Sequence, residues 1–517
     1  EMLRSLVGSE MCIRDRYNYS NQNGTGDVLG GMDSAEILKA MEAGLKTGMQ
    51  YNNEINNGGG LKVESLDSVL KILGNRMNQL VYYMEMPKHK IDNTVHQYNQ
   101  LYKYGEEVGI FNAEGETPQE TDSQYRRKSI VTKFMGVSGQ VTHPGMLAKL
   151  AGNMDMYQKE VENKTILLST IIDTRLVDAD SSCVEEQFDG VFRQHMLGIN
   201  EMDGGTAEGK TSEQLLDGYF NSPAVIDAQG YVLNDNLIQD AANVVVNVYN
   251  GYIDRIISNP IVFNNYVKMF HESKRVIVGL AASVTGATMG QSVNDVTTQF
   301  GKINIKNDRF FDERKPITAG KGASSAKAPV TPVVGITIKV NAADTKTNFG
   351  NHAGSYGYLV TAKNRYGESA PLNITFAGAR AVATSESVEF GFTAGVGSAY
   401  PATCFVVYRT KKNAVLNANT EYYPIFEVPA SQMATGYDGA AINCVRDRNR
   451  IIAGTKSALV YYNDSQINEY LQFADTMKMD FAVTSPSKRF AILNYGTPVL
   501  YQPAKIVRIV NIGEEGL

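Results

Sequence analysis

The eight residues Gly204–Thr211, GGTAEGKT, match the phosphate-loop pattern GxxxxGK[ST]. In such a loop, backbone amides and the lysine, here Lys210, surround nucleotide phosphates, and the pattern requires a buried strand before it and a helix after it. The preceding residues, HMLGINEMD, are polar and acidic, which is unfavourable for a central strand and for phosphate binding. The motif therefore indicates a glycine-rich surface turn, with nucleotide binding as the alternative.

The histidines and cysteines show no spacing typical of a metal site or a nucleophile. The cysteines Cys12, Cys183, Cys404 and Cys444 form no CxxC pair, which favours free thiols in a reducing compartment. Only Cys404 and Cys444, within one expected β module, are candidates to approach each other. We therefore predict no catalytic, cofactor-binding or metal-binding residues, and no enzyme activity.

Length and composition favour a folded protein of two to four domains. The 517 residues are 43% hydrophobic and 20% charged, and tryptophan does not occur. A net charge of -6 argues against a dedicated nucleic-acid-binding surface. No apolar run is long enough to cross a membrane, and no secretory signal is visible.

The N-terminal region is expected to be loosely built. Residues 5–16, SLVGSEMCIRDR, resemble a translated sequencing-adapter sequence, so we expect the native sequence to start near Tyr17; a natural polar leader is the alternative. An Asn- and Gly-rich arm follows. Amphipathic helices are predicted from Asp33 to Leu45 and from Ser65 to Pro87.

Residues 105–141 predict a long, polar hairpin with little core of its own. Its expected parts are a strand at Val108–Phe111, an acidic tip at Glu114–Ser123 and a return strand at Arg126–Val141. Opposite charges on the tip and the return strand suit contacts between subunits. The residues expected at such contacts are Glu114, Glu116, Glu120, Asp122, Arg126, Arg127 and Lys128.

Helical and strand patterns alternate after the hairpin. Residues 153–177 carry an apolar stripe that predicts the strongest helix in the chain, and residues 236–249 predict another. Strands are predicted at residues 253–260 and 300–311.

A β module follows a linker. Residues 316–332, PITAGKGASSAKAPVTP, have linker composition. The stretch YGYLVTAKNRYGESAP, residues 356–371, predicts a half-buried strand and a turn. Further alternation predicts strands at residues 388–392, 405–409 and 422–428. Because mixed structure resumes after it, the module is interpreted as an insertion into a domain whose halves flank it.

The order of these elements resembles the major capsid proteins of tailed bacteriophages, which have the Hong Kong 97 type of fold. The similar segments are VTHPGMLAKLAGNMDMYQKEVENKTILLSTIIDTRL, FDGVFRQHML, NLIQDAANVVVNVYNGYIDRIISNPIVFNNYV and FGKINIKNDRFF. They cover about residues 105–315, with a weaker match at 446–517. The module resembles fibronectin type III and other immunoglobulin-like insertions, although strands such as FVVYRTKK follow its YxVxAxNxxGxS-like phrase, which in fibronectin domains stands near the end.

The resemblance implies an α+β capsid fold and a structural role in an icosahedral head shell. Its expected parts are an adapter-like segment (1–16), an N-terminal arm with helices (17–104), an extended hairpin loop (105–145), a peripheral domain with a spine helix (146–235), an axial domain (236–315), an inserted immunoglobulin-like β-sandwich (316–445) and a return to the capsid core (446–517). Expected partners are copies of the chain in hexamers and pentamers, packaged DNA only by non-specific proximity, and scaffold, portal or decoration proteins, with no membrane. The expected location is the virion, after assembly in the host cytoplasm.

Two other classes stay open at this stage. The runner-up is a secreted or surface adhesin or glycan-binding protein with a fibronectin-like module. The lack of tryptophan and of a visible signal peptide weighs against it, since sugar sites commonly use aromatic platforms. An enzyme with an accessory module is the third class.

Overall fold

The computed structural model describes residues 79–105, 111–117, 119–147, 155–202, 205–269, 293–341, 344–374, 379–397, 399–432, 434–435, 443–483 and 485–514. Apart from residue 155, all of them belong to one compact unit, residues 73–148 and 156–517. The adapter-like segment, the arm, the predicted helix at Asp33–Leu45 and most of the helix predicted from Ser65 to Pro87 lie outside the described residues. Of the last of these, the described part begins at residue 79 and includes the short α4, Tyr82–Glu85.

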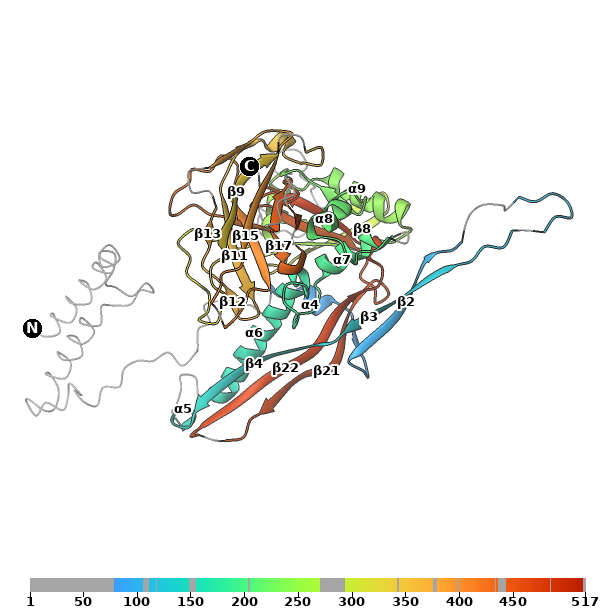
Figure 1. Ribbon diagram of the computed structural model, residues 1–517. Coiled ribbons are helices and arrows are strands. Elements are labelled where there is room, and N and C mark those ends of the chain that lie inside the picture. Colours follow the sequence, from blue (N-terminus) through green and yellow to red (C-terminus); the bar gives the residue numbers. More distant parts are fainter. Residues whose placement is uncertain are drawn as a thin grey trace, which may run out of the picture. The chain divides into compact units, whose positions relative to one another are not determined.

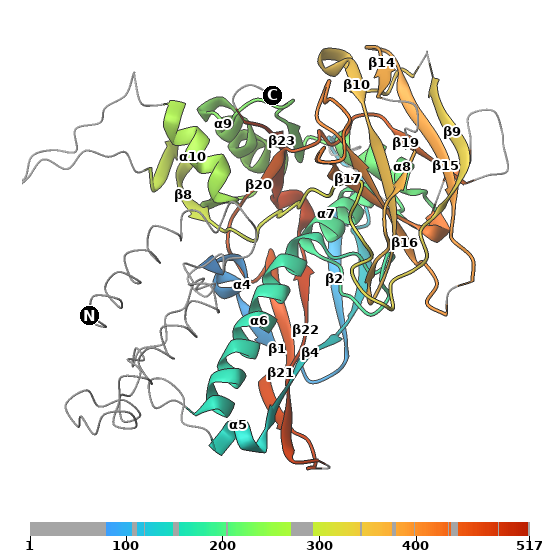
Figure 2. The ribbon, with the colours of Figure 1, turned by 90° about the vertical axis from the view of Figure 1, so that its left-hand side faces the viewer.

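A long helix lies along a four-stranded sheet (Figures 1 and 2). The sheet has the order β1-β21-β22-β4, with bounds Lys88–Lys90, Asn468–Asp480, Ser487–Leu500 and Lys133–Thr142. The helix α6, Met156–Asp178, buries Leu168, Ile172 and Leu176 in a cluster that includes Phe490 of the sheet. The helix predicted at residues 153–177 is present, since an apolar stripe at helical spacing must face a core. The short α5, His143–Leu147, follows β4.

A second sheet, with both parallel and antiparallel strands, forms a separate core. Its order is β5-β23-β20-β6-β8-β7, with bounds Val225–Asp227, Val507–Ile512, Lys456–Tyr461, Arg255–Ser258, Gly301–Asn307 and Asp295–Thr298. The helices α9, Asp235–Asn243, and α10, Pro260–Met269, contribute to its core. The helix predicted at residues 236–249 ends as a π-helical turn, η6, Val244–Val248. Both predicted strands are present but shorter than expected.

Two further helices lie between these two sheets. They are α7, Val191–Asn200, and α8, Ser212–Phe220, and a short 3-10 turn, η9, Pro503–Lys505, lies near α7. Gly190 precedes α7 where a Cβ atom would lie 2.8 Å from the amide nitrogen of Ala179. Only glycine therefore permits α7 to start this close to the end of α6.

The hairpin extends away from the sheets as a two-stranded ribbon of β2, Val95–Lys103, and β3, Gln124–Val131 (Figure 1). The partner of the return strand is thus Val95–Lys103 and not the predicted Val108–Phe111; residue 111 is not in a strand and residues 106–110 lie outside the described residues. The predicted return strand is also divided. It breaks at Thr132: β3, before the break, pairs with β2, whereas β4, after it, pairs with β22.

Residues 333–447 form two antiparallel sheets packed face to face. One sheet is β12-β11-β16-β17 with β13 beside β11, and the other is β18-β19-β15-β9. A shared apolar cluster lies between them and includes Tyr358, Val360, Phe390, Phe405 and Val407. The strand bounds are β9 Val333–Asn341, β11 Tyr358–Asn364, β12 Gly367–Glu368, β13 Leu372–Asn373, β15 Ser387–Thr393, β16 Cys404–Arg409, β17 Tyr423–Pro429, β18 Ala434–Thr435 and β19 Asn443–Asp447.

The remaining short elements of the sandwich are the pair β10, Gly354–Tyr356, and β14, Arg380–Val382, and the turns η7, Gly350–His352, and η8, Ala430–Gln432. The predicted β module is therefore a two-sheet sandwich. Its last strand continues to Asp447, two residues beyond the predicted boundary at 445. The described residues establish an α+β fold, whereas the immunoglobulin-like assignment of the sandwich stays a prediction.

The predicted linker, residues 316–332, lies along the sandwich and is tied to it. Ile317 forms an isolated bridge with Tyr422, and the backbone amide of Ser324 donates to the carbonyl of Glu368 over 2.9 Å. These backbone bonds fix a segment whose composition alone favours flexibility.

Candidate functional site

The hairpin presents two chemically different faces. Along β2 and β3, alternate residues are half-buried and exposed. On the half-buried face, Tyr98 and Ile130 pack against a small cluster at the base, and the Tyr98 ring meets the Tyr501 ring edge-on at 4.9 Å. The hairpin is therefore seated on β22 at its base while its length projects from the subunit.

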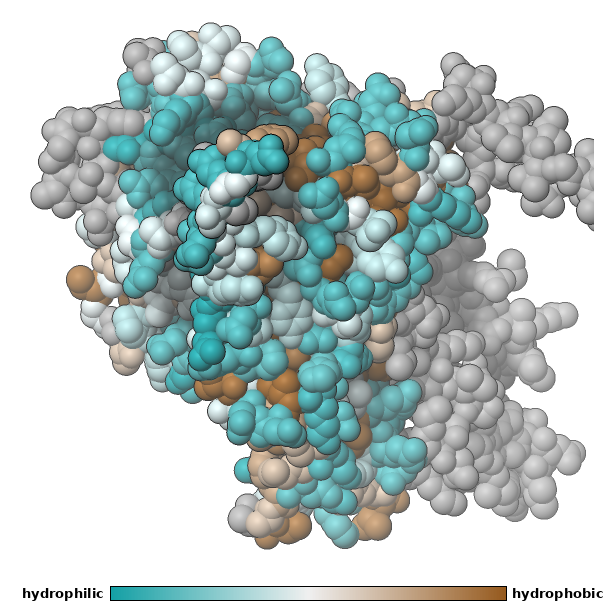
Figure 3. All heavy atoms as spheres, turned by 90° about the vertical axis from the view of Figure 1, so that its right-hand side faces the viewer, coloured by the Kyte–Doolittle hydropathy of each residue, from teal (hydrophilic) through white to brown (hydrophobic). Residues whose placement is uncertain are grey.

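The other face and the tip carry exposed apolar side chains. Tyr104 is 87% exposed, Phe111 99% and Tyr125 68%. Val95, Leu101 and Val131 are further exposed apolar residues of the same ribbon. Figure 3, seen from the side to which the hairpin points, shows apolar side chains in separate patches among hydrophilic ones.

The four acidic candidates, Glu114, Glu116, Glu120 and Asp122, are all exposed near the tip. One of them has a local role: a carboxylate oxygen of Glu116 accepts a hydrogen bond from the Ala113 amide over 3.0 Å, which closes the turn. These side chains are brought to one end of the ribbon, as the sequence predicts.

The three basic candidates are divided between the two faces of β3. Lys128 forms an ion pair with Glu201, and Arg126 donates to the Glu201 carbonyl over 2.9 Å, both on the half-buried face. Arg127, on the exposed face, donates to Asn99 across the ribbon over 3.1 Å. Sequence reasoning missed Glu201, which follows α7 and fixes the hairpin to the body of its own subunit.

The phosphate-loop motif lies between two helices. Residues 191–200 before it form α7, where the phosphate loop requires a strand. Lys210 donates to the Asn200 side chain over 3.4 Å, and Thr211 caps α8 in a reciprocal pair with Gln214. Gly204 lies outside the described residues. Residues 205–211 therefore form the predicted turn and a helix cap.

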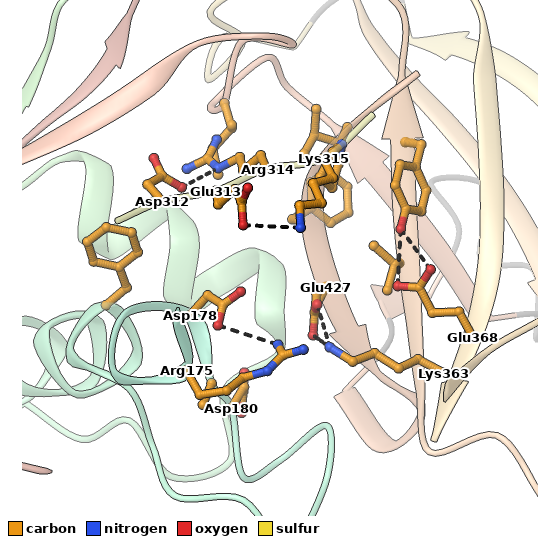
Figure 4. A pocket seen from close by; sticks show the side chains of 18 of the residues that line it. Arg175, Asp178, Asp180, Asp312, Glu313, Arg314, Lys315, Lys363, Glu368 and Glu427 are labelled. Carbon is orange, nitrogen blue, oxygen red and sulfur yellow. Dashed lines mark hydrogen bonds and ion pairs between the residues drawn. The ribbon is translucent and has the colours of Figure 1, made fainter. Parts of the chain in front are cut away.

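A cavity of about 1000 Å³ lies between the sandwich and the rest of the subunit (Figure 4). Its walls come from α6, from the segment at residues 312–318 and from the outer face of the sheet that contains β16. The ion pairs drawn in Figure 4 include Lys363–Glu427 at 2.7 Å, Arg314–Asp312 at 2.7 Å and Lys315–Glu313 at 3.2 Å. Burial is the largest single influence and would lower the pKa of Lys363, but the charge and hydrogen bond of Glu427, together with the charge of Asp178, raise it.

Two cysteines meet beside this cavity. Cys183, between α6 and α7, and Cys404, at the start of β16, are both buried. Their sulfur atoms and a Glu427 carboxylate oxygen all lie within 4.8 Å of one another. Sequence reasoning considered Cys404 only with Cys444, and spacing along the chain gave no signal for this group.

Arginines at the sandwich exit fasten it to α8. Arg446 pairs with Glu213 at 2.8 Å, and Arg448 pairs with Asp217 at 2.8 Å and Asp344 at 2.7 Å. Burial is the largest single influence and would raise the pKa of Asp344, but the bonds from Arg448, the Lys346 amide and Ser387, together with the charge of Arg448, lower the pKa to about 2. The alternation RDRNR, residues 446–450, was the available signal in the sequence, since every second residue shares a face of an extended chain.

Comparison with known proteins supports one of the three classes considered, the phage capsid proteins. No family model matches the chain. The major capsid proteins of Staphylococcus phage K and Staphylococcus phage S25-3 are each 22% identical over 497 residues, which is 92% of this chain and 95% of each relative. These relatives confirm the predicted resemblance to phage major capsid proteins, and with it the structural capsid role and the virion location.

Solved structures of low sequence identity are also similar over most of the chain. The capsid of a native GTA particle is 8% identical with a TM-score of 0.42, covering 89% of this chain and 99% of that one. The Gordonia phage Cozz structure is 10% identical with a TM-score of 0.39, covering 90% and 97%. The adhesin alternative finds no support among the sequence relatives. No helix among the described residues is long and apolar enough to span a membrane.

Proposed function

We propose that this chain builds the shell of a phage head by self-association, and that its hairpin lies across a neighbouring copy. The observation that carries the proposal is the two-faced ribbon, held to its own subunit at the base and exposing Tyr104, Phe111 and Tyr125 beyond it. Exposed apolar groups on an extended element gain most free energy when a partner covers them. In a closed shell every subunit offers the same ribbon and the same receiving surface.

The charges of the hairpin set the register of that contact. Glu114, Glu120 and Asp122 at the tip, together with Arg127, face outward, whereas Arg126 and Lys128 hold the base through Glu201. Each exposed pair contributes on the order of 0–1 kcal/mol, so the charges select the partner geometry more than they strengthen it.

Finer features belong to the same proposal. The copies assemble as hexamers and pentamers in the host cytoplasm, DNA is enclosed without specific contacts, and scaffold, portal or decoration proteins are further partners. The sandwich is proposed to be immunoglobulin-like, to lie at the outer surface and to stabilise the shell or provide weak adhesion. The relatives carry a structural role, which is consistent with a protein that is not an enzyme.

Deletion of residues 112–123 tests the hairpin. We expect a folded, soluble subunit that forms no shells, because the described residues of the segment are all exposed in their own subunit, while the segment supplies the distal part of the contact with the next. Electron microscopy and sedimentation velocity measure assembly, and circular dichroism checks the fold. Replacing the same residues by a Gly-Ser segment of equal length is the matched control that separates ribbon length from side-chain chemistry. Normal shells from both variants would refute the inter-subunit role.

A further inference from the structure

The sandwich and the rest of the subunit meet at a group of metal-ligating side chains. Cys404 and Glu427 lie on the outer face of one sandwich sheet, on the neighbouring strands β16 and β17. Cys183 approaches from the segment that follows α6. The convergence of three chain segments is a property of the tertiary structure and not of local spacing.

The geometry suits a small cation. The three ligand atoms lie within 4.8 Å of one another, and two of the three residues are fully buried. Around a tetrahedral zinc ion, ligand atoms at its usual bond lengths are roughly 3.5–3.8 Å apart. Modest side-chain rotations therefore bring both sulfurs and one carboxylate oxygen into bonding distance.

The charges also balance. Two thiolates and the Glu427 carboxylate carry three negative charges, which a divalent cation together with Lys363 neutralises. Lys363 bonds both oxygens of Glu427, at 2.7 and 2.8 Å, and so orients the carboxylate as an outer-shell partner. Lys363 and Glu427 line the cavity, so the carboxylate side of the group faces it.

We propose that Cys183, Cys404 and Glu427 bind a thiophilic divalent cation, of which zinc is the type, and that this ion clamps the sandwich to the rest of the subunit. Thiolate ligands select zinc over magnesium and calcium, which prefer oxygen. Binding replaces the two thiol protons by bonds to the metal and releases those protons to solvent, with no change of oxidation state. A buried disulfide between the cysteines is the competing outcome, and it gives the neighbouring Glu427 no role.

Metal content of the purified full chain tests the site. The protein is prepared with zinc and a thiol reductant, freed of unbound metal by gel filtration and measured by mass spectrometry for zinc. We expect one zinc ion per chain in the unaltered protein, loss of most of it in Cys183→Ser and Cys404→Ser, and weakened retention in Glu427→Gln. Cys444→Ser is the matched control, because Cys444 is a buried sandwich cysteine outside the group, and it should retain the ion.

A measurement on the unaltered protein protects the test from variants that fail to fold. Cobalt added in place of zinc should give the near-ultraviolet absorption of thiolate-to-cobalt charge transfer and the visible bands of a tetrahedral ion. Removal of the metal should lower the melting temperature of the unaltered protein but not that of Cys183→Ser. No bound zinc and no cobalt–thiolate absorption under reducing conditions would overturn the proposal, as would full zinc retention by Cys183→Ser.

Discussion

At the scale of single residues, the most consequential groups are two buried carboxyls at the start of α4. Asp308 accepts hydrogen bonds from the amides of Val81 and Tyr82, and Asp173 on α6 accepts one from Tyr83 over 2.7 Å. These bonds satisfy amides at a helix start that would otherwise be unpaired. Burial, and next the neighbouring Asp308, raise the pKa of Asp173 to about 8.

This raised pKa gives a pH prediction. A carboxyl with a folded-state pKa above its unfolded value favours folding when it is protonated, so its contribution is complete below about pH 4 and is lost as the pH rises through about 8. Asp173→Asn keeps the acceptor for Tyr83 without a charge. We expect the variant to gain stability over the unaltered protein between pH 5 and pH 8, by up to a few kcal/mol.

Urea unfolding at several pH values measures that difference. His195 contributes in the opposite direction, because its burial lowers its pKa to about 3, but it is common to both proteins and cancels. Asp178→Asn, at an exposed site of the same helix, is the control and should show no such gain. Parallel stability curves for Asp173→Asn and the unaltered protein would contradict the assignment.

At the scale of elements, the hairpin depends on its contacts with the body of the subunit as much as on the pairing of its two strands. A two-stranded ribbon is marginal alone, so its order comes from Tyr98, Ile130 and the contacts of Arg126 and Lys128 with Glu201. The side chains of these ion pairs are about a quarter exposed, which places the stabilisation on the order of 1 kcal/mol.

The substitution Glu201→Gln tests these contacts between the hairpin and the body of the subunit. The substitution keeps the backbone acceptor for Arg126 but removes the charge that pairs with Lys128 and Arg126, so we expect hydrogen exchange in β2 and β3 to become several-fold faster while α6 is unaffected. Exchange followed by mass spectrometry of the unassembled subunit measures it. Glu208→Gln, at an exposed position near Glu201 in the sequence, is the control. Equal exchange rates in both variants would mean that the aromatic contacts alone hold the hairpin to the subunit.

Whether an element could be predicted from the sequence depends on where its apolar residues lie. The helix α6 and strands such as β15 and β16 were predictable because one face, or both, is buried and apolar. The strand β2, VHQYNQLYK, was not predicted, because its half-buried face is built from His96, Tyr98, Gln100 and Tyr102 and gives no apolar alternation. The group of Cys183, Cys404 and Glu427 was out of reach for another reason, since only the packing of the sandwich brings such distant residues together.

At the scale of the whole molecule, the sandwich, which we propose to be an insertion, packs against the rest of the subunit through one sheet face and its exit. Its outer sheet face buries Val406, Tyr408 and Cys404 against neighbouring segments, and its exit carries the arginines that reach α8. An insertion at closely spaced ends folds without disturbing its host, yet a packed face adds stability to both partners.

Replacing residues 318–445 by a short Gly-Ser linker tests whether assembly and stability depend on the sandwich. We expect closed shells with a smoother outline in electron microscopy, because Arg446 and Arg448 remain to pair with Glu213 and Asp217. The melting temperature should fall by several degrees, since the face around Cys183 is uncovered. A variant that is insoluble or never assembles would place the sandwich in the structural core of the shell.

The division of the return strand at Thr132 has a mechanical consequence. One residue separates β3, in the hairpin, from β4, which pairs with β22 from Lys133 to Thr142. A pull on the hairpin by an adjoining copy therefore acts along β4, parallel to the strand, and loads its ladder of hydrogen bonds in shear. In that geometry the bonds resist together, whereas a pull at right angles would open them one after another. In a shell of linked ribbons, tension on each hairpin thus spreads into the sheet that packs on α6.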